Sequence, residues 1–411
     1  MTKGSSPIFG FCAPEFHAVE REFRRNFEER GELGGSVAIV VDGRPVVDLW
    51  GGLADEASGR EWMQDTLAVV FSCTKGLAAL CLHMLIDRGL LDVAAPVARY
   101  WPEFAANGKD GISVAMVMSH QAGLPVWQQP LPDGAMLDWD LAASRLAQEA
   151  PLWEPGTAHG YHANTLGFLE GEILRRITGC SIGQFLREGV TGPLEADAWI
   201  GLPESEEHRV ATLSLAGSDR TSSLVRKLKA EPNWFGWKLI TNSGGDGDLS
   251  SVNSRARHAA EIPASGGIAN ARALARIYAP LSLDGSVDGV RLVSAAALPT
   301  MRTVRSASDC DLMLRLPTTF TLGFSKSWGA RGLGPGNHVI LGEQAFGAPG
   351  LGGSLGFADG EARMAFGYVM NRHGAGVGLN DRGQSLVDAA YESMGFRLSP
   401  SGNWVRSELT R

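Results

Sequence analysis

The stretch Ser72-Cys73-Thr74-Lys75 lies where an apolar, strand-like run (66–71) ends and an apolar helix, predicted over 74–88, begins. Residues i and i+3 share one helix face, so we expect the Ser72 hydroxyl and the Lys75 amine to meet. An amine held in apolar surroundings can take the proton of a serine and make it a nucleophile. The helix N-terminus also offers free N–H groups to developing negative charge. Because S-x-x-K also occurs on ordinary surfaces, the rest of the chain must decide between a surface lysine and a catalytic pair.

The composition is typical of a globular protein with a sizeable core. The chain has 411 residues, 44% hydrophobic and 20% charged, with a formal net charge of −8. This acidic balance argues against nucleic acid or an anionic membrane surface as a partner, and no apolar run is long enough to span a bilayer. The five cysteines are widely spaced, which is typical of free thiols. With an N-terminus that lacks the features of a secretory signal, they predict a cytoplasmic protein.

The order of predicted elements indicates an α+β protein. Two strands, 35–41 and 44–50, flank an Asp42-Gly43 turn, and the remaining strands are predicted near the C-terminus at 319–324, 354–359 and 363–370. Helices are predicted at 14–31, 74–88, 113–120, 139–149, 164–178, 182–190, 270–280 and 381–394. We therefore expect one antiparallel sheet in a discontinuous domain, 1–72 and 255–411. A mainly helical domain, 73–254, is inserted in it and includes an irregular segment (200–254) typical of a lid or substrate wall, with the active site between the two domains.

Tyr161 lies in a Gly- and Pro-rich loop, 153–164, that leads into a predicted helix. A tyrosine at such a junction can hold its hydroxyl in a cleft. A phenol beside a lysine ammonium ionises more easily and can share proton transfer. The alternative is a tyrosine that packs its ring at the domain edge.

A second Gly-rich segment, 347–356, precedes a predicted strand. Such a segment lets a substrate lie against the backbone and offers N–H donors to an oxyanion. It contains a G-x-S-x-G pattern centred on Ser354, which in α/β-hydrolases requires strand, sharp turn and helix, with a later histidine. Here strand-like sequence follows, and His373 is the only later histidine. A glycine-lined strand start is therefore favoured over a Ser354 nucleophile.

Other reactive side chains favour structural roles. His159 and His162 have a spacing compatible with a metal, but no third ligand accompanies them, so we expect loop hydrogen bonds, no metal and no cofactor. One helical step turns Cys73 away from the Ser72/Lys75 face. His83 is expected in the core, and His120 is expected to brace the loop that follows it.

Taken together, the segments resemble the serine β-lactamase and penicillin-binding-protein superfamily, and within it most closely the family VIII carboxylesterases, relatives of class C β-lactamases. The resemblance covers about residues 14–405, with its motifs in family order. They are Ser72-Cys73-Thr74-Lys75, Ser119-His120-Gln121-Ala122-Gly123-Leu124 (similar to H-T-S-G-L), Trp153-Glu154-Pro155-Gly156-Thr157 with Tyr161, and Gly350 to Phe357.

The resemblance implies a β-lactamase/transpeptidase-like fold, with an antiparallel sheet flanked by helices plus the inserted helical domain. It implies Ser72 as nucleophile and Lys75 with Tyr161 as the proton-transfer pair. Gly350 and Leu351 match the family's third motif. By that match, the backbone N–H groups of Ser72 and Leu351 form the oxyanion hole.

Two departures narrow the expected substrate. The third position of the Y-x-N motif is Ala163, with Asn164 one residue late, and the lysine position of K-T-G is Ala348. In β-lactamases and transpeptidases these side chains hold the amide and carboxylate of the substrate. Their loss favours a serine carboxylesterase that hydrolyses small or short-chain esters through an acyl-enzyme on Ser72, with Gly350, Ala163 and Asn164 as substrate-binding positions.

Three alternatives use the same serine: an acyltransferase, an amidase and a weak β-lactamase. A non-catalytic binding protein on this fold is a fourth. Tryptophans can line an apolar pocket or pack in the core, and the sequence leaves both roles open for Trp127, Trp153, Trp234, Trp237 and Trp328.

Overall fold

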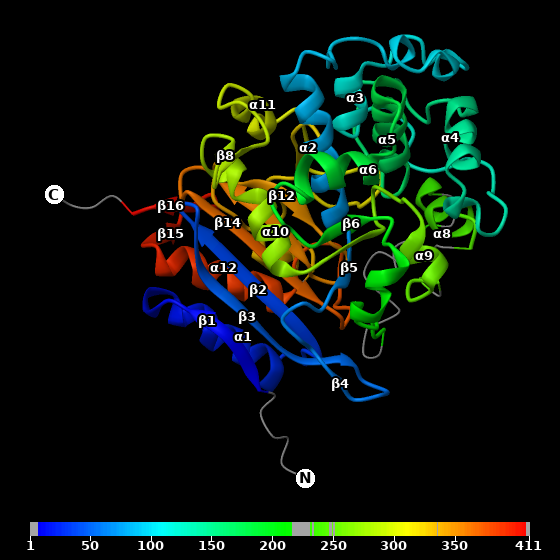
Figure 1. Ribbon diagram of the computed structural model, residues 1–411. Coiled ribbons are helices and arrows are strands. Elements are labelled where there is room, and N and C mark those ends of the chain that lie inside the picture. Colours follow the sequence, from blue (N-terminus) through cyan, green and yellow to red (C-terminus); the bar gives the residue numbers. More distant parts are fainter. Residues whose placement is uncertain are drawn as a thin grey trace.

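Strands from the two ends of the chain form one antiparallel sheet in the computed structural model (Figure 1). The structure describes residues 7–215, 231, 234–245, 249, 251–334 and 336–407. The strand order is β1-β3-β2-β14-β13-β12, and β4 pairs with β3. These strands are β1 (Ile8–Cys12), β2 (Gly34–Val41), β3 (Arg44–Asp55), β4 (Arg60–Glu61), β12 (Phe346–Pro349), β13 (Leu355–Asp359) and β14 (Met364–Met370). The expected α+β class and the shared sheet are confirmed.

The centre of the sheet is the pairing of β2 with β14, from Val41↔Met364 to Gly35↔Met370. β2 turns into β3 through Asp42 (φ 51°) and Gly43 (φ 77°), a pair of positive φ values that matches the right-handed twist of a two-residue hairpin. All residues of β13 and β14 are buried, since helices cover both faces of the sheet.

One face packs on α1 (His17–Glu28) and α12 (Asp381–Ser393), which contact each other. On this side the Tyr391 ring of α12 stacks on Phe357 of β13, with centroids 6.2 Å apart. The other face packs on α10 (Ala271–Tyr278). There a Cβ at Gly367 would lie 2.1 Å from the Ala271 carbonyl oxygen, so the close approach of helix to strand requires glycine.

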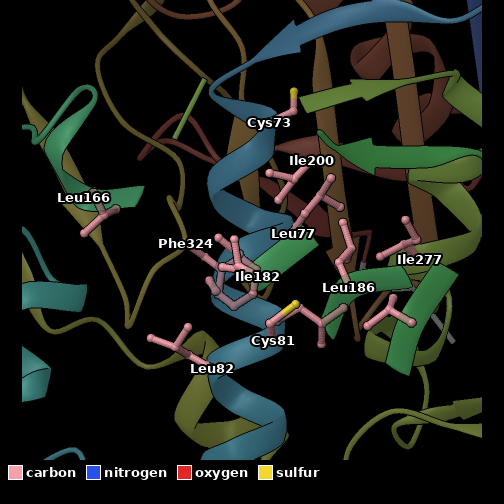
Figure 2. Packing of buried hydrophobic residues seen from close by; sticks show 14 of the residues in the cluster. Cys73, Leu77, Cys81, Leu82, Leu166, Ile182, Leu186, Ile200, Ile277 and Phe324 are labelled. Carbon is pink, nitrogen blue, oxygen red and sulfur yellow. The ribbon is translucent and has the colours of Figure 1, made fainter. Parts of the chain in front are cut away.

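Helix α2 (Cys73–Asp87) lies in the core, as its apolar sequence predicts, and every residue from Cys73 to Leu85 is buried. Figure 2 shows Leu77, Cys81 and Leu82 of α2 among side chains from elements distant in sequence. α5 (Thr165–Thr178) and α6 (Ile182–Leu186) pack on α2, and α3 (Val114–Met118) and α4 (Trp139–Gln148) pack on α5. Burial of each large aliphatic side chain contributes about 1.5–3 kcal/mol, so the start of α2 is anchored by the core.

A small sheet of three strands holds the N-terminal end of α2. β5 (Ala68–Phe71) leads into the helix and pairs with β7 (Gly267–Ala269), which pairs with β6 (Ala198–Ile200). Because β6 comes from within 73–254 and β7 from within 255–411, this sheet joins both predicted domains; the boundaries themselves stay a prediction.

Some predicted elements are shorter than expected. The helix predicted at 182–190 ends at Leu186 and continues as a π-turn, Arg187–Thr191. The strand predicted at 319–324 is β11 (Thr318–Phe320), paired with β10 (Ser306–Ser308). Of the irregular segment 200–254, residues 216–230, 232–233, 246–248 and 250 lie outside the described part, and the rest holds short helices.

The remaining short elements connect these layers. They are η1 (Pro14–Phe16), η2 (Val97–Arg99), η3 (Pro102–Ala105), η4 (Ala135–Leu137), η6 (Glu204–Arg209), η7 (Phe235–Trp237), α8 (Lys238–Thr241), α9 (Arg255–Ala259), η8 (Pro280–Ser282), β8 (Ser286–Val287), β9 (Val290–Arg291), α11 (Leu298–Arg302), η9 (Arg331–Leu333), β15 (Phe396–Leu398) and β16 (Trp404–Arg406). No helix within the described ranges is long and apolar enough to cross a bilayer.

Candidate active site

Ser72 occupies the tight turn between β5 and α2. Phe71, just before it, has a φ of +44°, a left-handed conformation that bulky residues rarely adopt and that only a well-packed surrounding can hold. The Thr74 hydroxyl donates to the Phe71 carbonyl and accepts from the Gly267 N–H of β7 at 2.8 Å. The turn is thus locked on its buried side, and Ser72 lies in the wall of a cavity.

Lys75 lies beneath Ser72 with only 4% of its surface exposed. Its Nζ is 3.1 Å from Ser72 Oγ, 2.7 Å from the Ala163 carbonyl oxygen and 2.9 Å from the Ala264 carbonyl oxygen. Burial lowers the pKa of Lys75 from 10.5 to about 7. A neutral amine has two N–H groups, which the two carbonyls accept, and one lone pair, which then faces Ser72. The geometry suits a general base.

Tyr161 lies close to both groups. Lys75 Nζ is 4.7 Å from the centroid of its ring, which also stacks on Phe320 at 6.0 Å. Burial raises the pKa of Tyr161 well above its ordinary value of 10, and the Ser72 hydroxyl offsets this only in part. The expectation that the nearby lysine makes this phenol ionise more easily is therefore wrong, because desolvation by burial has the largest effect on its pKa. The phenol stays protonated at neutral pH and can donate a proton.

Gly350 brings a second backbone segment to the nucleophile. A Cβ at this residue would lie 2.3 Å from the Val70 carbonyl oxygen, so only glycine lets the end of β12 approach β5 so closely. The next residue, Leu351, lines the same cavity as Ser72. Within the described ranges, the backbone N–H groups of Ser72 and Leu351 donate to no protein acceptor. Two such N–H groups at one cavity can bind an oxyanion.

The cavity has a volume of about 150 Å³ and a mostly apolar wall. Of the residues singled out from the sequence, Ser72, Tyr161, Ala163, Asn164, Leu351 and Trp328 line it. Gly350 is not among the residues that line it, although its neighbours Pro349 and Leu351 are. The other tryptophans do not line the cavity: Trp127 donates its indole N–H to the Ala142 carbonyl, and Trp234 donates to that of Leu312. The remaining lining residues are Phe71, Leu239, Leu249, Arg257, Ser265, Leu314, Thr318, Phe320, Ser325, Pro349 and Val377.

Asn164 reaches the cavity although it stands one residue late in its motif. Its Oδ1 accepts a hydrogen bond from Ser265 Oγ at 3.0 Å. Ser265 follows Ala264, whose carbonyl holds Lys75. Neither Ala264 nor Ser265 was singled out from the sequence. The sequence signal that could have found them is the Ser265-Gly266-Gly267 turn before β7. Phe71 and Phe320 were counted as parts of strands, and nothing in the sequence marks Leu314 or Thr318.

The two alanine departures have different structural consequences. Ala163 contributes its carbonyl oxygen, which holds Lys75, so a side chain at this position is not needed to orient the amine. Ala348 is buried in β12, where its Cβ lies 3.3 Å from the position that a Cβ of Gly76 would take. It packs on α2 and presents no charge to the cavity.

The Ser354 alternative fails on geometry. Ser354 is fully buried, strand β13 follows it, and it does not line the cavity. Within the described ranges its hydroxyl and both ring nitrogens of His373 have no hydrogen-bond partner, so the two do not form a pair.

The histidines serve the scaffold. His162 Nε2 accepts from the Leu124 N–H at 3.1 Å, and His120 Nδ1 accepts from the His162 N–H at 3.0 Å. His83 contacts the Leu322 carbonyl at 2.9 Å in the core. Cys73 is buried, which raises the pKa of its thiol. The described residues hold no cluster of three or more His, Cys, Asp or Glu suited to a metal.

Comparison with known proteins gives consistent matches. The Beta-lactamase family model matches residues 19–391. The esterase/beta-lactamase LipL of Mycobacterium tuberculosis is 38% identical over 89% of this chain and 83% of its own length. A crystal structure of a family VIII carboxylesterase has a TM-score of 0.83 and 38% identity, covering 94% of this chain and all of that one. A penicillin-binding-protein homologue from Caulobacter crescentus has the same TM-score and coverage at 36% identity.

Proposed function

Since this chain belongs to the beta-lactamase family as one of its serine hydrolases, we propose that it is a carboxylesterase that hydrolyses small or short-chain esters through an acyl-enzyme on Ser72. The observation that carries the proposal is the placement of Lys75. Its Nζ lies 3.1 Å from Ser72 Oγ, and two backbone carbonyls accept the hydrogens of its neutral form. An amine held in this way has its lone pair free for the serine proton.

The proposed reaction has two stages. Lys75 takes the Ser72 proton as Oγ attacks the ester carbonyl, and the N–H groups of Ser72 and Leu351 stabilise the oxyanion. Tyr161, protonated at rest, donates to the departing alcohol oxygen and recovers a proton from Lys75. Water then attacks the acyl-enzyme. Tyr161 and Lys75 take the proton of this water and return a proton to Ser72 Oγ, which frees the carboxylic acid and restores Ser72.

We expect the cavity to favour an uncharged ester of modest size. The cavity is small and mostly apolar, and the positions of Ala163 and Ala348 offer no polar side chain to it. An uncharged ester needs no ionic partner there, and it avoids the cost of burying a charge. Of the cavity residues, Arg257 alone carries a charged side chain, and it donates to Ser265.

Ser72→Ala tests the proposal, with Ser354→Ala as a matched control. Turnover of a nitrophenyl acetate should fall by several powers of ten in Ser72→Ala and stay at the wild-type rate in Ser354→Ala. A fluorophosphonate probe should add its mass to a peptide containing Ser72. Retained turnover in Ser72→Ala, or an adduct on Ser354, would overturn the assignment.

Hydrolysis of β-lactams is the second candidate, since the relative LipL is described as both an esterase and a beta-lactamase. Nitrocefin separates the two functions. We expect its kcat/KM to lie well below that for the ester, because no lysine stands at residue 348. A higher kcat/KM for nitrocefin than for the ester would reverse the order of the candidates.

We also propose a reducing compartment, the cytoplasm, as the working location. All five cysteines are free thiols, including the exposed Cys310. Fractionation of the producing cell with an antibody to the chain tests this location, and recovery outside the cytoplasm would refute it.

A further inference from the structure

Asp311 is a fully buried carboxylate outside the cavity wall, on the loop between β10 and β11. Its Oδ1 accepts from the Met313 N–H at 2.7 Å and the Leu314 N–H at 2.8 Å, and its Oδ2 accepts from the Thr318 hydroxyl at 3.1 Å. The Tyr161 N–H lies 3.1 Å from each of the two oxygens. One side chain thus joins its own loop to the backbone of the tyrosine.

The contacts around Asp311 clamp two segments together. The His159 carbonyl accepts from the Leu312 N–H at 3.2 Å, and His159 Nε2 is 2.9 Å from Thr318 Oγ1 and 3.6 Å from Asp311 Oδ2. The clamped loop supplies Leu314 to the cavity, and β11, which follows the loop, supplies Thr318 and Phe320. Phe320 also stacks on the Tyr161 ring. The position of the Tyr161 phenol relative to Ser72 is therefore held through both the backbone and the ring of Tyr161.

We propose that Asp311 is a positioning residue that holds the Tyr161 phenol where it can donate a proton to the leaving alcohol. The inference rests on the proposed function, in which Tyr161 is that donor. Asp311 touches neither the nucleophile nor the cavity, so it acts through the Tyr161 backbone. An error of about 1 Å in a catalytic group costs on the order of 10²-fold in rate, which a lost backbone anchor can produce.

The test compares two esters of the same acid, one with an alkyl alcohol and one with a nitrophenol. An alkoxide is a poor leaving group and needs the proton, whereas a nitrophenolate leaves without much help. Asp311→Asn keeps the shape but replaces one of the two oxygens facing the Tyr161 N–H with an NH₂ group that cannot accept. We expect kcat/KM to fall about 100-fold for the alkyl ester and less than about 10-fold for the nitrophenyl ester.

Asp359→Asn is the matched control. Asp359 is also a fully buried carboxylate that accepts from two backbone N–H groups, of Glu361 and Ala362, and from the Tyr391 hydroxyl, but it lies at the end of β13, away from the cavity. This variant should lower the melting temperature and leave the ratio between the two esters unchanged. An unchanged ratio in Asp311→Asn, with a similar loss of stability, would overturn the inference.

Two further variants keep the result interpretable. Tyr161→Phe should show the same selectivity for the leaving group, more strongly; if it does not, the proposed function fails rather than the role of Asp311. His159→Phe retains a ring against Phe320, 5.3 Å away, but removes the polar contacts to Thr318 and Asp311. If Asp311→Asn does not fold, His159→Phe decides the question. A smaller loss of kcat/KM that is again larger for the alkyl ester supports the clamp. An equal loss of kcat/KM for the two esters refutes it.

Discussion

The pKa of Lys75 leads to a quantitative prediction for the pH dependence of ester hydrolysis. At pH 8, a lysine with the ordinary pKa of 10.5 is neutral in about 1 of 300 molecules, whereas one with a pKa of about 7 is neutral in about nine of ten. Burial therefore raises the fraction of usable base by roughly 300-fold. Since kcat/KM reports the free enzyme, it should rise about tenfold per pH unit below pH 7 and level off above it.

We assign the acid limb of the pH profile, the rise below pH 7, to Lys75 because its Nζ lies 3.1 Å from Ser72 Oγ. Burial lowers the pKa of His162 to about 3 and that of His120 well below 6.5, so both stay neutral across the limb. Besides Cys73, whose thiol pKa is raised by burial, Lys75 interacts with Glu170 on α5, and burial raises the pKa of Glu170 well above 4.5. No hydrogen-bond partner for its carboxyl lies within the described ranges, which favours the protonated form. Glu170→Gln should therefore leave the limb in place.

Lys75→Arg removes the base without removing the side-chain bulk, because a guanidinium does not lose its proton in proteins. We expect a loss of about 10²–10⁴-fold in kcat/KM at every pH. Lys109→Arg is the matched control, since Lys109 is likewise buried and donates to the carbonyls of Ala106, Ala147 and Glu149, away from the cavity. Stopped-flow or plate assays from pH 5 to 10, with circular dichroism of each variant, provide the measurement. A limb centred above pH 9, or an active Lys75→Arg, would refute the reasoning.

Two further variants test the backbone approach at the cavity and the buried charges of the scaffold. Gly350→Ala places a Cβ 2.3 Å from the Val70 carbonyl oxygen, so we expect the Leu351 N–H to shift. As a result, kcat/KM for a nitrophenyl ester should fall about 10²–10³-fold. In the control Gly360→Ala, the nearest atom to the new Cβ is 3.6 Å away, and kcat/KM should match that of the wild type. Arg382→Met removes the cation that pairs with buried Glu32 at 2.7 Å and leaves it the Tyr368 hydroxyl, so we expect a loss of about 3–5 kcal/mol in urea unfolding. Arg24→Met breaks an exposed pair with Glu20 and should cost at most about 1 kcal/mol; equal losses would contradict this contrast.

The parts of the site that could be predicted are those encoded by local spacing or by a motif. Ser72 is the N-cap of the helix that contains Lys75, three residues further on, so their contact follows from local helix geometry. Tyr161 and Leu351 were placed near them through the order of family motifs, and both line the cavity.

The parts that could not be predicted depend on backbone atoms and on burial. The acceptors that hold Lys75 are carbonyl oxygens of residues 163 and 264, and any amino acid at those positions offers the same atom. The protonated state of Tyr161 depends on how completely the surrounding elements exclude water, which no short window of sequence reports. Asp311 meets Tyr161 only through tertiary packing.

The fold shows a similar division. The hairpin of β2 and β3 and the core helix α2 follow from turn chemistry and apolar pattern. The strand predicted at 319–324 ends at Phe320 because Thr321 N–H bonds to the Phe324 carbonyl, which closes a turn around Gly323 (φ +83°). The apolar alternation in this stretch thus marks a buried turn as well as a strand.

The pairing of β2 with β14 has a consequence for synthesis of the chain on the ribosome. Ser72, Lys75 and Tyr161 are synthesised early, whereas Leu351 and β14 emerge only when synthesis of the chain is nearly complete. Until then β2 presents an apolar open edge, a surface prone to pairing with other chains. Closing a contact across so long a loop is slow, so refolding should be limited by sheet closure rather than by formation of α2. A chain truncated before residue 346 therefore retains the three reactive side chains and hydrolyses no ester.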